Sequence, residues 1–208
     1  MDIPAEQLER ANEKARRRKQ VRDRILETKT REKGLLIVHT GKGKGKSTAA
    51  FGMALRAIGH GQRVGIVQFV KGKWETGERG VLERFADQVT IQVLGEGFTW
   101  ESQDKQADIR AAQRAWQASC EMIEASRGPE PSYDLLILDE LNIVLRDGTL
   151  ALQPVLDTLA AKPGALHVVV TGRNAKPELI ELADLVTEMT LVKHPFRAGV
   201  KAQAGIEF

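Results

Sequence analysis

An apolar run that leads into a glycine–lysine loop constrains the fold of this chain more than any other feature. Residues 36–40 read Leu-Ile-Val-His-Thr, and residues 41–48 read Gly-Lys-Gly-Lys-Gly-Lys-Ser-Thr. A β-branched strand, a glycine-rich turn and the start of a helix, in that order, make up the phosphate-binding loop of many α/β proteins. The pattern therefore predicts an α/β fold built around a bound nucleoside triphosphate.

Each residue type in this loop has a physical reason to face phosphate. Gly41, Gly43 and Gly45 let backbone N–H groups approach a ligand without a Cβ in the way. A helix that begins near Lys46 adds its dipole, and the Lys46 ammonium should reach the β- and γ-phosphates. The Ser47 hydroxyl is placed to bind Mg²⁺, or Mn²⁺ in its place. We predict a nucleotide site that consists of Thr40, Gly41, Lys42, Gly43, Lys44, Gly45, Lys46, Ser47 and Thr48.

The loop is a shortened variant of the common Walker motif, which reads Gly, four residues, then Gly-Lys-Ser/Thr. Counting back from Gly45 puts the first glycine at the position of Thr40, whereas the chain places it one residue later, at Gly41. Lys42 and Lys44 also make the loop unusually cationic. We therefore expect the phosphates to bind differently from those in an ordinary ATPase.

A second segment, residues 134–141, reads Asp-Leu-Leu-Ile-Leu-Asp-Glu-Leu. Its four apolar residues predict a buried strand. Asp139 and Glu140 follow at the carboxyl end, where open α/β sheets bind ligands. Either carboxylate can hold Mg²⁺ directly or through water, and Glu140 can alternatively act as a general base. The sequence predicts a metal site of Ser47, Asp139 and Glu140 without deciding between the two carboxylates.

The remainder of the chain alternates between strand and helix patterns, which is typical of a parallel sheet with helices on both faces. We predict a mostly parallel α/β sheet of the P-loop, RecA-like kind. Arg173 follows a predicted strand at the edge where the carboxyl ends meet, and it can bind phosphate or form a surface salt bridge. The predicted strands are 35–39, 63–70, 89–94, 135–138, 167–171 and 185–192, and the predicted helices are 47–58, 105–125, 155–160 and 178–183.

Residues 1–33 form a charged arm that differs from the domain predicted for residues 34–208. The arm holds eleven Lys/Arg and seven Asp/Glu, so its net charge is +4, whereas the whole chain carries +3. Residues 5–32 predict a helix with a mostly charged surface. Three interpretations stay open: a solvated arm, a lid or dimer contact, or nucleic-acid binding by residues 16–19. Interspersed acids and the lack of nearby aromatics make the third the least favoured.

Composition excludes several classes of protein. No apolar run approaches the roughly 18 residues of a membrane span, and the N-terminus has no signal-peptide pattern. Cys120 is the only cysteine, which excludes an internal disulfide and a multi-cysteine zinc site. We expect a cytoplasmic protein with no membrane partner.

Two large aromatic residues, Phe98 and Trp100, lie in a predicted loop that reads Gly-Glu-Gly-Phe-Thr-Trp over residues 95–100. Loop aromatics can anchor a core or can stack on a flat ligand. The residues alone do not decide between these roles.

Taken together, these segments resemble the corrinoid adenosyltransferases of the bacterial cobalamin pathway, the type that carries a phosphate loop. The resemblance covers nearly the whole chain from Gly34 onward. It implies transfer of the 5′-deoxyadenosyl group of ATP to the cobalt of a reduced, cob(I) corrinoid, with release of triphosphate. The stretches that carry it include the short loop, Gly97-Phe-Thr-Trp100, Leu138-Asp-Glu-Leu141, Thr171-Gly-Arg173 and Ala198-Gly-Val-Lys-Ala-Gln203.

The resemblance also implies roles for particular residues. In this family, aromatic side chains displace the lower ligand of the cob(II) form and make it easier to reduce, and Phe98 and Trp100 stand at the matching positions. Lys46 and Arg173, with Lys44 and Mg²⁺, are implied to stabilise the departing triphosphate. One departure is Lys42, which stands where the family usually has Asn.

Partners follow from the same resemblance. It implies ATP as co-substrate, a corrinoid as substrate, a flavoprotein or another electron donor, and a homodimer in which the N-terminal arm helps to cover the corrinoid. The sequence is also compatible with two alternative functions. A P-loop ATPase or nucleoside kinase would release ADP in place of triphosphate, and a nucleic-acid-binding motor would bind DNA or RNA in a salt-sensitive way.

Overall fold

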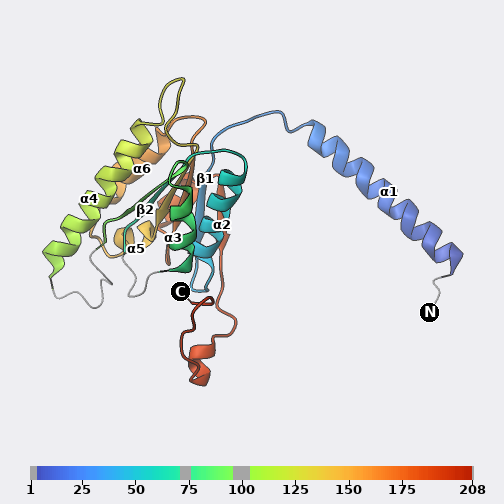
Figure 1. Cartoon of the computed structure of the whole chain (residues 1–208). Helices are drawn as coiled ribbons and strands as arrows, with labels where there is room; N and C mark the ends of the chain where they lie inside the picture. The colour runs from blue at the N-terminus through green and yellow to red at the C-terminus, as the bar shows by residue number, and fades with distance from the viewer. Residues whose placement is uncertain (1–3, 71–75, 96–103, 208) are drawn as a thin grey trace. The chain divides into compact units, whose positions relative to one another are not determined.

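The structure, a computed structural model, describes residues 4–70, 76–95 and 104–207 and contains one parallel sheet (Figure 1). The six strands lie in the order β3-β2-β4-β5-β1-β6, and every adjacent pair is parallel. The predicted α/β class with a parallel sheet is therefore confirmed. The strands are β1 Leu36–Thr40, β2 Val64–Gln68, β3 Val89–Val93, β4 Leu135–Asp139, β5 His167–Thr171 and β6 Leu185–Glu188.

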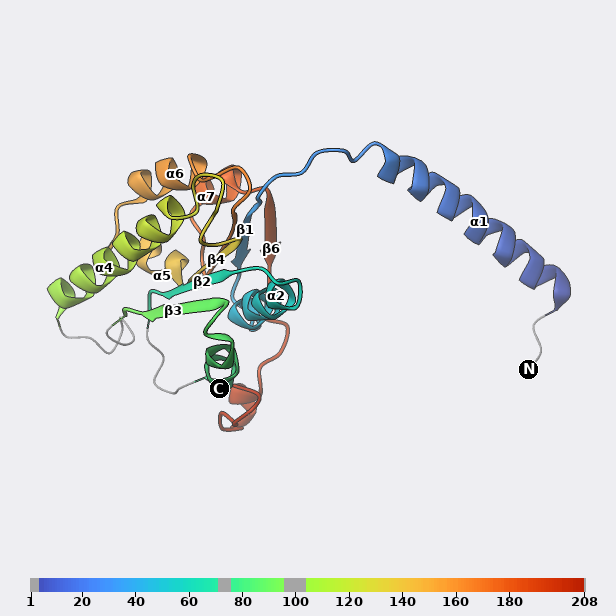
Figure 2. The same cartoon turned by 45° about the horizontal axis from the view of Figure 1, so that its top comes forward.

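Helices cover both faces of this sheet (Figure 2). Alternate side chains of β4 show why: Leu135 and Ile137 pack in the cluster that contains α2, whereas Leu136 and Leu138 pack in the cluster that contains α4, α5, α6 and α7. Each face therefore has its own apolar core. The helices are α2 Lys46–Gly59, α3 Gly77–Leu82, α4 Lys105–Glu124, α5 Leu141–Arg146, α6 Leu152–Ala160 and α7 Pro177–Leu182, with 3₁₀ turns at Glu83–Phe85 and Pro195–Ala198.

The strand order brings the two chemically important strand ends to one edge of the sheet. β5 lies between β1, which leads into the glycine–lysine loop, and β4, which ends at Asp139. One strand between the phosphate-loop strand and the acidic strand is the arrangement expected of a RecA-like P-loop fold. The edge formed by the carboxyl ends is also where open parallel sheets bind their ligands.

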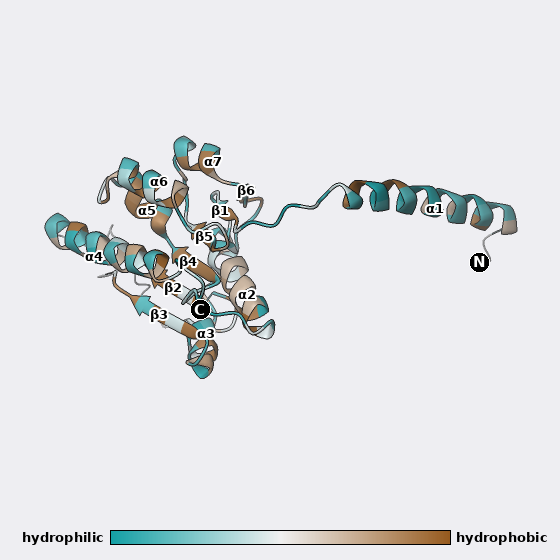
Figure 3. Cartoon of the chain, turned by 90° about the horizontal axis from the view of Figure 1, so that it is seen from above, coloured by the Kyte–Doolittle hydropathy of each residue, from teal (hydrophilic) through white to brown (hydrophobic). Residues whose placement is uncertain are grey.

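Helix α1, Ala5–Glu27, belongs to a separate compact unit, Met1–Glu32, while Lys33–Phe208 form the other unit. None of the described residues of α1 is buried, and Figure 3 shows this helix as mostly hydrophilic. Ion pairs one turn apart, such as Arg10–Glu6 at 2.6 Å, connect its exposed side chains. The helix ends earlier than predicted, because Thr28 turns its N–H and hydroxyl back onto the carbonyl of Ile25.

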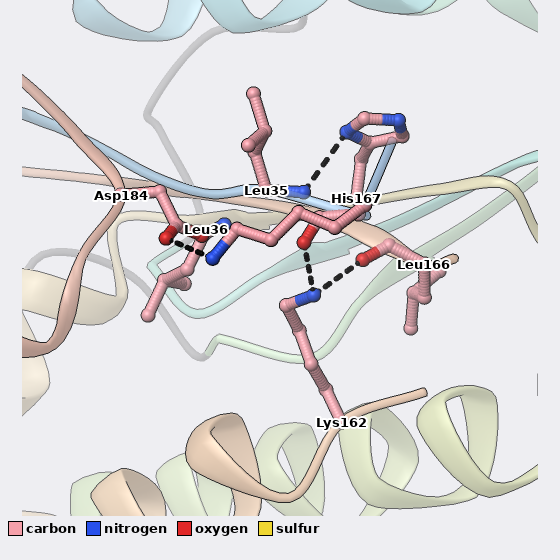
Figure 4. Close-up of polar contacts among 8 residues, drawn as sticks. Leu35, Leu36, Lys162, Leu166, His167 and Asp184 are labelled. Atoms are coloured by element: carbon pink, nitrogen blue, oxygen red, sulfur yellow. Dashed lines mark hydrogen bonds and ion pairs between the residues drawn. The ribbon is translucent and has the colours of Figure 1, made fainter. Parts of the chain in front are cut away.

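The second unit holds its own N-terminal end firmly, through polar contacts at the start of β1 (Figure 4). Asp184 accepts the Leu36 N–H at 2.9 Å, and the His167 Nδ1 accepts the Leu35 N–H at 3.1 Å. The Lys162 ammonium donates to two backbone carbonyls, at 2.6 and 2.8 Å. Burial and then the charge of Lys162 lower the pKa of His167, so the ring stays a neutral acceptor.

Two short helices were not predicted, and strands β2 and β6 both end earlier than predicted. The missed helix α3 contains two glycines, and the missed helix α5 continues the apolar run of β4, so neither has a separate helical pattern. Strand β6 ends at Glu188 and not at residue 192, because the chain then crosses the glycine–lysine loop. Within the described residues, no helix is long and apolar enough to span a membrane.

Candidate active site

The backbone of Met189 and Thr190 packs against the glycine–lysine loop. Gly41 and Gly45 have φ angles of 95° and 101°, which side-chain-bearing residues rarely adopt. A Cβ on Gly43 would lie 2.6 Å from the carbonyl oxygen of Thr190, and one on Gly41 would collide with the Met189 carbonyl. The glycines therefore also admit the segment after β6, a role that nothing in the sequence signals.

Lys46 begins α2, as predicted, and its side chain is buried, with the residue only 6% exposed. Its ammonium donates to the Gly43 carbonyl inside the loop. Burial lowers the pKa of Lys46, the Glu140 carboxylate opposes that shift, and the charges of Arg173 and Lys44 add to it. Four charged side chains from three segments thus act on one another at this edge of the sheet.

Asp139 is buried and already has protein donors on both carboxylate oxygens. Gln68 Nε2 donates to Oδ2 at 3.0 Å, and the Thr171 hydroxyl donates to Oδ1 at 2.7 Å. The three residues end β2, β4 and β5, so the carboxylate ties three neighbouring strands together at the site.

Glu140 is the strained and unsatisfied member of the acidic pair. Its φ is 62°, and its N–H donates to the Thr171 hydroxyl at 2.9 Å. Its Oε2 is buried and has no hydrogen-bond partner among the described residues. Burial, and then the neighbouring Asp139, raises the pKa of Glu140 to about 7. An unpartnered buried carboxylate oxygen near Lys46 suits a site that receives a cation.

No group of three His, Cys, Asp or Glu side chains in residues 4–70, 76–95 and 104–207 is arranged to hold a metal. Mg²⁺ in nucleotide sites commonly uses one or two carboxylates, a hydroxyl, phosphate oxygens and water, and needs no such cage. The ligand set of Ser47, Asp139 and Glu140 stays a prediction, and the unpartnered Glu140 oxygen supports it.

The other predicted residues divide between described and undescribed parts of the chain. Lys42, Thr48 and Arg173 are exposed, and Ser47 is partly buried. The Thr40 hydroxyl accepts the Ala175 N–H at 3.0 Å, which connects the loop after β5 to the phosphate loop. The predicted aromatic residues, Phe98 and Trp100, lie outside the described residues.

Two polar residues near the site were not among the predicted site residues. Asn142 donates from Nδ2 to the Gly172 carbonyl at 3.0 Å, and its Oδ1 has no hydrogen-bond partner among the described residues. Glu207 forms an ion pair with Lys44. Neither belongs to a recognised phosphate-binding motif, so the sequence held no signal for either.

These features define a P-loop nucleotide-binding protein: a strand, a glycine-rich turn, a helix that begins at a buried lysine, and an acidic strand end two strands away. The family profile described as ATP:corrinoid adenosyltransferase BtuR/CobO/CobP matches residues 32–208. A corrinoid adenosyltransferase of Pseudomonas aeruginosa is 50% identical over the full length of both chains.

Two further relatives agree. A corrinoid adenosyltransferase of a Sinorhizobium species is 52% identical over 94% of this chain and 90% of its own, and corrinoid adenosyltransferase CobA of Salmonella typhimurium is 45% identical over 92% and 96%. The chain belongs to the ATP:corrinoid adenosyltransferase family. The predicted family is confirmed, and with it the prediction of an ATP-dependent transferase that acts on a corrinoid.

Proposed function

We propose that this chain transfers the 5′-deoxyadenosyl group of ATP to a cob(I) corrinoid and releases intact triphosphate. The reduced cobalt attacks C5′ with its electron pair, the cobalt–carbon bond forms, the C5′–O bond breaks, and triphosphate leaves with the bonding electrons. The observation that carries the proposal is the short cationic loop in a chain of this family, since its lysines would stabilise the charge of a leaving triphosphate.

Three cations have the task of stabilising the departing triphosphate. Lys46 is desolvated, so its interaction with phosphate oxygens is strong. The charge of Arg173 lowers the pKa of both Lys46 and Glu140, so we place its guanidinium near the same phosphates. Lys44 lies in the loop itself. Fixed charges of this kind lower the barrier because they are in place before the C5′–O bond breaks.

Mg²⁺ would be held by Ser47, Asp139 and Glu140 and would neutralise part of the triphosphate charge. Glu140 is the better direct ligand, because its Oε2 has no other partner among the described residues, whereas both oxygens of Asp139 already accept hydrogen bonds. Adenosyl transfer removes no proton from the substrate, so a general base is not needed and Glu140 is free to serve the metal.

We assign Phe98 and Trp100 to displacement of the lower corrinoid ligand, which eases reduction of cob(II) by a flavoprotein or another donor. The charged arm of residues 1–33 is assigned to covering the corrinoid in a homodimer, and the protein to the cytoplasm. Family membership supports these assignments.

The direct test is an anaerobic assay with the full chain, ATP, Mg²⁺ and a chemically reduced corrinoid. We expect a light-sensitive cobalt–carbon product together with one triphosphate for each adenosyl group transferred. Formation of ADP and phosphate alone would support the ATPase or kinase alternative instead.

A variant separates the redox role of the aromatic loop from general damage. Trp100→Ala should slow turnover from cob(II) with a weak reductant far more than turnover from pre-reduced cob(I), while Trp100→Phe keeps most of both. Equal loss in the two assays for Trp100→Ala would argue against ligand displacement.

A further inference from the structure

The C-terminal tail reaches the phosphate loop and neutralises one of its lysines. The Glu207 carboxylate forms an ion pair with the Lys44 ammonium, and their side chains are 17% and 47% exposed. A turn fixes the end of the tail, because the Gln203 carbonyl accepts the Glu207 N–H at 2.9 Å. Lys46, by contrast, donates to a carbonyl of the loop itself. Lys44 is thus the loop cation whose partner comes from a distant part of the chain.

The tail also lies beside α3 and beside α2, the helix that follows the phosphate loop. Figures 1 and 2 both show the C-terminus next to α3. Between the tail, α2 and α3 lies a cavity of about 350 Å³, whose walls include Thr48, Phe51, Val81 and Ile206. Glu207 therefore approaches Lys44 from a segment that borders the first turns of α2.

We propose that Glu207 competes with triphosphate for Lys44. A carboxylate and a phosphate oxygen are equivalent partners for a lysine ammonium, and a triphosphate bound in the loop would bring several negative charges close to the Glu207 carboxylate. A bound nucleotide would therefore either displace Glu207 from Lys44 or be weakened by repulsion between the carboxylate and the triphosphate. After transfer, Glu207 returns to Lys44 and helps triphosphate to leave, a role that rests on triphosphate being the product proposed above.

The test measures binding of inorganic tripolyphosphate with Mg²⁺ to the full chain, by calorimetry at low salt. Glu207→Gln keeps the size and removes the charge, and we expect it to bind tripolyphosphate about two- to fivefold more tightly, the upper range of a partly exposed ion pair. Glu130→Gln is the matched control, because it makes the same charge change in an exposed loop elsewhere. It should leave the affinity unchanged.

A double-mutant cycle shows whether the effect acts through Lys44. Lys44→Gln should weaken tripolyphosphate binding, and Glu207→Gln should add nothing in that background. In turnover assays, tripolyphosphate should inhibit the Glu207→Gln enzyme more strongly than the wild type.

Three results would overturn the proposal: unchanged or weaker binding by Glu207→Gln, an equal gain with and without Lys44, or an equal gain for Glu130→Gln. The binding assay contains no corrinoid and measures no adenosyl transfer. Failure of the proposed reaction and failure of this competition are therefore distinguished by separate experiments.

Discussion

At the scale of single residues, the site is charged before any ligand binds, and its charges are incompletely paired. Lys46 is buried with a lowered pKa, and Glu140 is partly buried, with a raised pKa and a buried oxygen that has no partner among the described residues. The ionised form of each group is less stable here than in water, and a bound ligand of opposite charge would stabilise it. This arrangement lowers the stability of the ligand-free protein and strengthens its interaction with a phosphate and a cation.

Lys46→Ala should reduce kcat/KM for ATP by about a hundredfold or more, because it removes a desolvated cation from the leaving group. Lys42→Ala is the control: Lys42 is an exposed lysine of the same loop, and its loss should cost only a few-fold, roughly the effect of an exposed charge. Steady-state kinetics with pre-reduced corrinoid measure both. Comparable losses would mean that the loop acts through net charge alone.

Glu140→Gln should stabilise the ligand-free protein at high pH. The pKa of Glu140 is about 7 in the folded chain against an ordinary value of 4.5, so the folded state keeps a proton that the unfolded state has lost between these values. The wild-type free energy of unfolding therefore falls as pH rises from 4.5 to 7. Glutamine never ionises, so the variant should gain about 3 kcal/mol over the wild type at pH 8 and little at pH 4.5.

Urea unfolding in EDTA at a series of pH values measures this difference, and the same variant should lose Mg²⁺-dependent ATP binding. Asp139→Asn is the contrasting variant, because the amide replaces an oxygen that accepts a hydrogen bond from Gln68 or Thr171. It should destabilise the protein at pH 8 by about 1–3 kcal/mol. A Glu140→Gln protein that is less stable than wild type at pH 8 would contradict the burial argument.

At the scale of elements, prediction succeeded where a segment carries its own pattern. The apolar run before Gly41, the helix that begins at Lys46 and the acidic end of β4 were each predicted from consecutive residues and are confirmed. Helix α5 was missed because Leu141–Arg146 continue an apolar run, so the change from strand to helix depends on the left-handed backbone at Glu140.

Contacts between distant segments were beyond prediction for a different reason. The Met189 carbonyl accepts the Gly43 N–H at 2.6 Å, and Glu207 pairs with Lys44, although more than a hundred residues separate each pair in sequence. Such contacts depend on the path of the chain after β6, and no local pattern of side chains specifies that path.

The crossing of the loop by residues 189 and 190 gives a prediction at this scale. Gly43→Ala should destabilise the protein by about 1–3 kcal/mol, because the new methyl group lies within 2.6 Å of the Thr190 carbonyl and forces the two segments apart. Gly52→Ala is the control. It lies in the exposed part of α2 with nothing within 4 Å of the new Cβ, so it should stabilise by about 0.5–1 kcal/mol.

Thermal unfolding followed by circular dichroism measures both glycine variants, and ATP binding should weaken only for Gly43→Ala. A tolerated Gly43→Ala with normal ATP affinity would show that the segment after β6 moves aside easily.

At the scale of the whole molecule, the chain separates a packed nucleotide domain from an arm that has no core. Unit Lys33–Phe208 contains both apolar clusters, while α1 buries none of its described residues. A 23-residue helix without a buried face gains little stability from packing. The arm can be a lid or a solvated segment, and these two interpretations predict different effects of its removal on corrinoid turnover.

Deleting residues 1–32 should leave the domain folded and able to bind ATP. The truncated chain would begin at Lys33 and keep the contacts of Asp184, His167 and Lys162 with the start of β1. Its melting temperature should stay within a few degrees and its Kd for Mg²⁺-ATP within about twofold of the full chain, because the arm adds no core.

Corrinoid turnover by the truncated chain should nevertheless fall about tenfold or more, since an uncovered corrinoid loses both contacts and protection from water. Ala15→Pro in the full chain is the matched variant: it breaks α1 while keeping the length and the charge of the arm. A lid requires both variants to lose turnover while ATP binding stays intact. Full activity in both would show that the arm is a solvated segment, and loss in the deletion alone would show that its charge matters and its helix does not.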